Sequence, residues 1–436
     1  MKNYYFLLLQ SVVATRSVSD VASHFLVTYQ DTTAATMDQL DYWPRANVYQ
    51  AMFDHYELTG LRDSTLNQYL SKLSKFDYKG DSNQYLDDRA WLALAALKAH
   101  DLQPNQEYID HAAHEHQLMQ QSWSSKCGGG VLWTINGDYK NTIANGLYFE
   151  LSSKLFLKTK NQFYLNEAQK TIDWIMNVAK LYDGKVFLDG IKNIDSTCSL
   201  NGGIYSYQHG VIISGMVNMY KATSDQNWLG QAVQMAVNSI SSFSTNNVIR
   251  EYSSCDRSGS ANDCGNDGAL FKGIYVRGLY RLLQVTGVNP QTSSVAKLLS
   301  NSWNSLTETD MYSANPQTLV AGLNWAGKSQ RKDSRAQVIA LDLLNSQYVV
   351  SPQETLACVY WDANFGGRQI CYTEQGYYDA PWNDAISSLI VVAPKCKVTL
   401  AEDGNMGGRT KTFGYGSVPY VGKDFNDITS SLQISC

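Results

Sequence analysis

A short pattern that ends helices recurs along most of the sequence and restricts the folds that the chain can adopt. Apolar residues spaced three and four apart predict helices from about residue 20 to residue 350. A period of about sixty residues fits helix hairpins, none of which can bury its apolar face alone. Six hairpins that close on themselves predict an α/α barrel with inner and outer helices, although an open helical solenoid would show the same pattern. The similar helix ends lie at 56–60, 97–101, 156–160, 220–224 and 284–287, and a sixth hairpin is expected around 336–344.

Two adjacent carboxylates, Asp87 and Asp88, directly precede an alanine- and leucine-rich helix. Inside a helix neighbouring side chains point about 100° apart, but where a loop enters a helix both carboxyls can face the barrel mouth. A helix N-terminus also favours carboxylate anions. Cleavage of a glycosidic bond needs two carboxyl groups, and repulsion between two close charges separates their pKa values. The pair is therefore a candidate catalytic site, although an aspartate here could simply cap the helix.

Aromatic and polar segments precede several other predicted helices. Together with the carboxylate pair, and in the same order along the chain, they resemble glycoside hydrolase family 76, the α-1,6-mannanases. The resemblance covers residues 30–345 and implies an (α/α)6 barrel that cleaves α-1,6-mannan internally with retention and without a cofactor. The segments that carry it are 41–47, 129–133, 140–150, 205–211 and 271–277.

The same resemblance implies roles for individual residues. Asp87 corresponds to the nucleophile and Asp88 to the acid/base. Asn141 and Asn145 correspond to positions that line the family's substrate cleft. The chain is also rich in tyrosine and tryptophan, which suit the stacking of sugar rings as well as ordinary cores. Four further matches are expected to bind substrate, namely Trp133, Tyr207, Gln208 and Lys272.

The sequence changes character after Pro352, where strand-like alternation and paired glycines replace the helical period. Two similar copies follow, each with a Gly-Gly-Arg step and an Asn-Asp-x-x-Ser-Ser segment, the latter at 383–388 and 426–431. Two copies of about forty residues predict two Greek-key motifs packed as a β-sandwich. The arrangement closely resembles the βγ-crystallin family, and we expect this domain to span 355–436.

In the βγ-crystallin family the repeated Asn-Asp-x-x-Ser-Ser segment implies a paired calcium site. By position, Asp384 and Asp427 would supply carboxylates, and Ser387 and Ser430 would supply hydroxyls. Calcium takes such hard oxygen ligands. The same side chains can instead stabilise a turn through hydrogen bonds to the backbone.

Export from the cell is expected from the N-terminus and from the cysteines. Residues 1–19 are interpreted as a secretory signal, because Lys2 precedes an apolar stretch too short to span a membrane. Eight cysteines suggest four disulfides in an oxidising compartment. The clustered His111, His114 and His116 have the spacing of a solvated helix face, so we do not expect a metal there. By proximity along the chain we expect the disulfides Cys127–Cys198, Cys255–Cys264, Cys358–Cys371 and Cys396–Cys436.

The charge of the chain excludes some classes of partner. A formal net charge of −5 without a basic tract gives no reason to bind nucleic acid or an anionic membrane. We therefore expect a secreted, monomeric glycoside hydrolase whose catalytic domain spans 20–350 and whose substrate is α-mannan. One alternative is a cell-wall transglycosidase of the same family. The other is a non-catalytic carbohydrate-binding protein.

Overall fold

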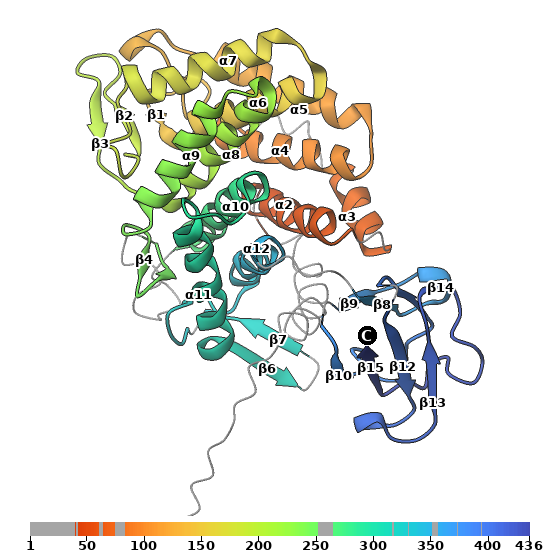
Figure 1. The fold of residues 1–436 in the computed structure, drawn as a ribbon. Helices are drawn as coiled ribbons and strands as arrows, with labels where there is room; N and C mark the ends of the chain where they lie inside the picture. The colour runs from red at the N-terminus through yellow and green to blue at the C-terminus, as the bar shows by residue number, and fades with distance from the viewer. Residues whose placement is uncertain are drawn as a thin grey trace, which may run out of the picture.

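The computed structural model describes residues 40, 42–60, 64–74, 83–251, 265–315, 318–329, 331–350, 356–372, 374–393 and 395–436. Helices dominate this part of the chain up to Val350, and antiparallel strands form the part from Ala357 onward (Figure 1). The predicted signal segment 1–19 and the predicted disulfide Cys255–Cys264 lie outside the described residues.

Within the described residues, six helices form a closed inner ring. Each of them contacts the next along the chain, and the last contacts the first, so the ring has no open edge. Most side chains of these helices are buried, which is why their sequences are apolar on nearly every face. The inner helices are α2 (Tyr42–Thr59), α4 (Leu86–Leu102), α6 (Thr142–Thr159), α8 (Ser206–Thr223), α10 (Gly268–Thr286) and α12 (Ser334–Val350).

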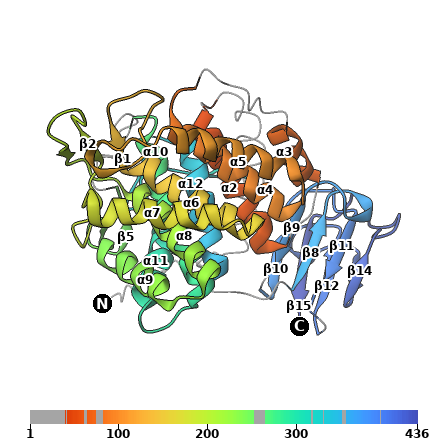
Figure 2. The same cartoon turned by 90° about the horizontal axis from the view of Figure 1, so that it is seen from above.

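A second layer of helices packs outside the ring (Figure 2). An outer helix follows each of the first five inner helices in the chain and returns to the starting end, so the inner helices all run in the same direction. The outer helices are α3 (Ser64–Ser74), α5 (Gln106–Gln121), α7 (Gln162–Asp173), α9 (Gln226–Ser239) and α11 (Ser293–Thr309). Short strands lie in the connections: β1 (Lys140–Asn141), β2 (Gly190–Lys192), β3 (Ser199–Asn201), β4 (Ser244–Thr245), β5 (Val248–Ile249), β6 (Met311–Asn315) and β7 (Thr318–Ala321).

The recurring sequence pattern has a local structural cause. In four inner helices the last residue is a threonine whose hydroxyl donates to the carbonyl four residues earlier, at 2.7–3.2 Å. The residue after each threonine has a positive φ, between 58° and 71°, which stops the helix. The repeat therefore marks the points where the chain leaves the inner ring. The pairs are Thr59 with Gly60, Thr159 with Lys160, Thr223 with Ser224, and Thr286 with Gly287.

Buried ion pairs join four helices of the ring. Arg281 on α10 donates to Asp54 on α2 at 3.0 Å and to Glu150 on α6 at 2.9 Å. Arg277, one turn earlier on α10, pairs with Asp342 on α12 at 2.9 Å. Arg281 is half-buried and its carboxylate partners are buried, and charges that are withdrawn from water need such opposite charges beside them. The apolar spacing did not predict these ions.

The C-terminal strands form two four-stranded antiparallel sheets, in the orders β14-β11-β8-β9 and β10-β15-β12-β13. Each sheet takes one strand from the other sequence copy, since β10 and β14 have exchanged places. Apolar side chains from both sheets, among them Val359, Leu389, Val398 and Leu432, form one buried core. The strands are β8 (Ala357–Tyr360), β9 (Gln369–Tyr372), β10 (Gly376–Asp379), β11 (Ser388–Val391), β12 (Lys397–Ala401), β13 (Thr410–Phe413), β14 (Gly416–Val418) and β15 (Ser431–Ser435).

Three of the predicted disulfides are confirmed: Cys127–Cys198, Cys358–Cys371 and Cys396–Cys436. In the described part of the chain, no helix is long and apolar enough to cross a bilayer.

The interpretation of the histidine cluster on α5 was wrong for two of its members. His111 and His116 are buried, and only His114 is exposed. His116 bonds to the hydroxyl of Ser152 at 2.9 Å. The face of α5 that carries His111 and His116 therefore packs against the ring.

Loss of one buried ion should destabilise the ring. Replacing Arg277 with methionine leaves the Asp342 carboxylate buried without its partner, so we expect Arg277→Met to lower the free energy of unfolding by about 3–5 kcal/mol. Urea unfolding followed by helical circular dichroism measures this change. Lys126→Met, which removes an exposed pair with Asp195, is the control and should cost under about 1 kcal/mol. Equal effects of the two substitutions would contradict the role given to the buried pair.

Candidate active site

The N-termini of the inner helices gather at one end of the ring, because those helices run in the same direction. Their unpaired N–H groups make this end electropositive and favourable for anions. Asp87 and Asp88 lie in the first turn of α4 at this end, and both are half-buried.

A two-stranded contact fixes the entry to α4. The amide of Leu86 donates to the carbonyl of Trp133 at 2.9 Å, and the amide of Ile135 donates to the carbonyl of Gln84 at 2.9 Å. This pairing brings the Trp133 side chain to the start of the helix, where its indole Nε1 donates to Oδ2 of Asp87 at 3.0 Å. The backbone register therefore determines which aromatic side chain bonds to the carboxylate.

Asp88 is held from the other side by the loop before α4. The Asn83 amide donates to Oδ2 of Asp88 at 3.1 Å, and Nε of Arg89 donates to the Asn83 carbonyl at 2.8 Å. The same Arg89 forms a buried pair with Glu115 on α5, 3.1 Å away. The outer helix thus fixes the loop that orients Asp88.

Burial and repulsion raise the pKa of Asp87 to about 7. Loss of hydration is the largest cause and the charge of Asp88 is the second, while the hydrogen bond from Trp133 opposes both. Two close carboxyls titrate as a pair. Near neutral pH the raised pKa therefore lets the pair keep a proton that an isolated aspartate would lose, so the pair can supply an acid beside a carboxylate.

A third carboxylate, Asp189, lies near this end and was missed by the sequence reasoning. It accepts hydrogen bonds from the Tyr139 hydroxyl, from the Asn201 amide at 2.9 Å and from the Gln208 amide at 3.3 Å. Burial raises the pKa of Asp189, and the bond from Tyr139 opposes that rise. Its position in a glycine-containing loop before an inner helix, next to Gly190, was the signal that could have identified it.

Half-buried aromatic rings from α10, α2 and the start of α8 lie together at the same end. Tyr207 stacks on Phe271 with ring centres 4.0 Å apart, and Tyr205 and Trp43 approach Phe271 at 5.4 and 6.3 Å. The charges of Asp189 and Asp87 are among the causes, after burial, that raise the pKa of Tyr207. The aromatic cluster therefore lies within electrostatic reach of both carboxylates, and such rings suit contact with sugar faces.

Some of the remaining sequence-predicted residues lie near the carboxylates, and others only hold the backbone in place. Gln208 is buried beside Asp189, and its Oε1 has no hydrogen-bond partner among the described residues. Asn141 caps α6 by accepting from Ala144 at 3.1 Å, whereas the Asn145 amide is used entirely within the protein.

Lys272 is also buried, and it donates to the Leu323 carbonyl. Asn145 and Lys272 therefore position loops, while Trp133, Tyr207 and Gln208 lie close to the carboxylates.

The chain is similar in sequence and in fold to proteins of one known family. The model of glycosyl hydrolase family 76 matches residues 13–356. Mannan endo-1,6-alpha-mannosidase DCW1 of Candida albicans is 26% identical over 330 residues, which span 68% of this chain and 70% of that protein. The GH76A alpha-1,6-mannanase of a Salegentibacter species has a similar fold, with a TM-score of 0.67 and 23% identity, over 77% of this chain and 100% of the other. An inactive variant of it was solved with alpha-1,6-mannotetrose. Dfg5 of Chaetomium thermophilum gives a TM-score of 0.64 at 22% identity, over 78% and 90% of the two chains.

The raised pKa of Asp87 should make stability depend on pH. Because its folded pKa of about 7 exceeds the ordinary value of 3.8, the folded protein binds more protons between these values, and the contribution of Asp87 to stability falls as pH rises. Asp87→Asn cannot ionise, so its free energy of unfolding should exceed that of the parent by about 4 kcal/mol near pH 7 and by under about 1 kcal/mol near pH 4. Urea titrations across this range measure the difference. Asp110→Asn, at an exposed site on α5, should show no such trend, and a trend of equal size in both variants would contradict the assignment.

Proposed function

The chain belongs to glycosyl hydrolase family 76, and from this premise we propose that it is a secreted endo-acting enzyme that hydrolyses α-1,6-mannan. We classify its helical part as an (α/α)6 barrel on the same grounds. The observation that carries the proposal is the pair Asp87 and Asp88 at the end where the inner helices begin, with the pKa of Asp87 raised to about 7. The curated relatives, named as mannan endo-1,6-alpha-mannosidases, support the choice of substrate.

In the proposed mechanism the two carboxyls act from neighbouring positions. Asp88 donates its proton to the glycosidic oxygen while Asp87 attacks the anomeric carbon, so the bond to the leaving sugar breaks as an ester to Asp87 forms. Asp88, now a carboxylate, removes a proton from water, and the resulting hydroxide displaces Asp87 with net retention. The raised pKa of Asp87 places the proton on that residue in the free site, so the division of roles is taken from the family and requires the proton to lie on Asp88 when substrate is bound. The indole N–H of Trp133 favours that arrangement, because it stabilises the charged form of Asp87.

Substrate recognition is proposed for the groups around the pair. The Phe271 cluster offers aromatic faces for sugar rings. Asp189, Asn201 and Tyr139 form a polar group whose oxygens and amide suit sugar hydroxyls. Gln208 is fully buried and donates to Asp189, so it orients that carboxylate.

For the C-terminal sheets we propose a βγ-crystallin-type sandwich that binds calcium. The hydroxyl of Ser387 donates to Asp427 at 3.1 Å, and that of Ser430 donates to Asp384 at 3.5 Å. Each pair joins the two sequence copies and gathers oxygen atoms of the kind that calcium prefers. These contacts between hydroxyl and carboxylate groups of the two copies support the assignment of the four residues as calcium ligands.

Catalysis should depend on both carboxylates. Asp87→Asn removes the nucleophile and Asp88→Asn removes the acid, so each should lower the release of reducing ends from unbranched α-1,6-mannan by at least about 100-fold. Circular dichroism should show that both variants remain folded, and Asp110→Asn is the matched surface control. Unchanged turnover in both site variants would end this proposal.

The same two steps can end in transfer when a sugar hydroxyl replaces water. Products formed with an added oligosaccharide acceptor distinguish these outcomes: elongated chains indicate a transglycosidase, and free reducing ends indicate a hydrolase. Mannan that is bound but never cleaved would favour the non-catalytic alternative.

Calcium should stabilise the β-sandwich by mass action. At a concentration 100-fold above its Kd, the ion should add about 2.7 kcal/mol to the free energy of unfolding. Calorimetry with calcium and with a chelator should show an upward shift in the melting of this domain. Asp384→Ala with Asp427→Ala should abolish the shift, whereas Asp379→Ala, at an exposed position on β10, should retain it. A shift that survives in the double variant would contradict the assigned ligands.

A further inference from the structure

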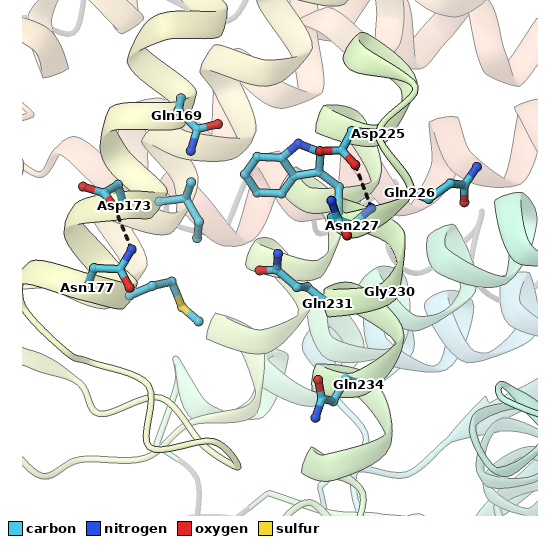
Figure 3. Close-up of a pocket in the computed structure, with 12 residues that line it drawn as sticks. Gln169, Asp173, Asn177, Asp225, Gln226, Asn227, Gly230, Gln231 and Gln234 are labelled. Atoms are coloured by element: carbon cyan, nitrogen blue, oxygen red, sulfur yellow. Dashed lines mark hydrogen bonds between the residues drawn. The ribbon is translucent and has the colours of Figure 1, made fainter.

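A groove of about 910 Å³ opens on the outer layer of the helical part, between α7 and α9 (Figure 3). Its volume lies at the upper end of the range for small-molecule sites. Residues from α7 and from the π-helical turn after it, Trp174–Val178, form one side, and residues of α9 form the other. The groove shares no lining residue with the site around Asp87 and Asp88.

Uncharged amides dominate the lining of this groove. Carboxamides both donate and accept hydrogen bonds, as sugar hydroxyls do. Among the lining residues drawn in Figure 3 the marked bonds are Asn177 to Asp173 and the backbone of Asn227 to Asp225, so the glutamine amides are not bonded to one another. The amides belong to Gln169, Asn177, Gln226, Asn227, Gln231 and Gln234.

An aromatic side chain completes the groove. Trp228 is half-buried, and its ring lies 6.4 Å from that of Phe149 on the inner helix α6, so the core holds one part of it in place. Ile172 and Met176 add further apolar surface on the opposite side. A fixed indole beside exposed amides offers both an apolar face and hydroxyl partners to a sugar.

The charges of the lining exclude other classes of ligand. Asp173 and Asp225 are its charged residues, and the lining contains no lysine, arginine or histidine. A phosphate, a nucleic acid or an acidic polysaccharide would need cations there. A protein partner would more often meet aromatic, methionine and arginine side chains than a row of glutamines. A neutral, hydroxyl-rich chain fits the groove best.

We propose that the groove between α7 and α9 is a second binding site for a neutral oligosaccharide segment of the polymer that the enzyme cleaves. The identity of that polymer as α-mannan rests on the proposed function. A polysaccharide long enough to occupy both sites would bind at two points, so its local concentration at the catalytic pair would rise. A short oligosaccharide would gain nothing, because it cannot occupy both sites at once.

The test uses the full chain with substitutions that either fill the groove or remove its amide groups. A Cβ added at Gly230 meets no atom within 4 Å, so Gly230→Leu should project into the groove without a clash, and Gly230→Ala is its matched control. Gln231→Ala with Gln234→Ala removes two exposed amides. Binding is measured by the retardation of the protein in gels that contain linear α-1,6-mannan. In this assay every variant also carries Asp87→Asn and Asp88→Asn, which prevent cleavage. The effect of the groove on turnover is measured in variants with both aspartates intact. The KM is determined for this mannan and for an α-1,6-linked tetrasaccharide.

We expect Gly230→Leu and the double glutamine variant each to weaken mannan retardation and to raise the KM for mannan, both by about tenfold. Turnover of the tetrasaccharide should not change. Undiminished retardation in both variants would overturn the proposal, as would an equal loss in Gly230→Ala or a parallel loss of tetrasaccharide turnover. Failure of the proposed function is a separate result, since an unmutated chain that cleaves neither substrate can still be retarded through the groove.

Discussion

The common direction of the inner helices is the constraint on which the rest of the structure depends. Because an outer helix returns the chain after each of the first five inner helices, the inner N-termini lie at one end, and so do the side chains of their first turns. The carboxylate pair, the aromatic cluster and Asp189 therefore meet although they come from segments far apart in the sequence. The buried pairs that Arg277 and Arg281 form across α2, α6, α10 and α12 hold this arrangement together.

Sequence reasoning predicted the features that follow from local chemistry. A threonine with a left-handed residue after it ends a helix wherever it occurs, so the repeat revealed the inner helices. Nearby cysteines pair because little chain separates them, as Cys358 and Cys371 do. The role of Asp189, the ion pairs between the inner helices and the burial of His116 could not be predicted in this way. Their partners come from distant segments of the chain, and a helix that is buried on all sides gives no periodic signal of which polar residue faces which neighbour.

The attachment of the β-sandwich limits what it can do for the site. It follows Val350, the last residue of α12, whereas the carboxylates lie at the end where the inner helices begin. A helix of 17 residues is about 25 Å long, so the sandwich joins the ring at the end remote from Asp87 and Asp88. The groove on α7 and α9 lies on the outer layer instead.

The proton balance of the carboxylate pair needs two opposing influences. Burial alone would favour the neutral form of both carboxyls, and a pair that holds two protons has no nucleophile. The N-terminus of α4 and the indole of Trp133 favour the charged form and limit the rise in pKa. In water, both groups would ionise near their ordinary values and no acid would remain at neutral pH. A half-buried pair at a helix N-terminus meets both requirements, and this is why adjacent residues can serve as acid and nucleophile here.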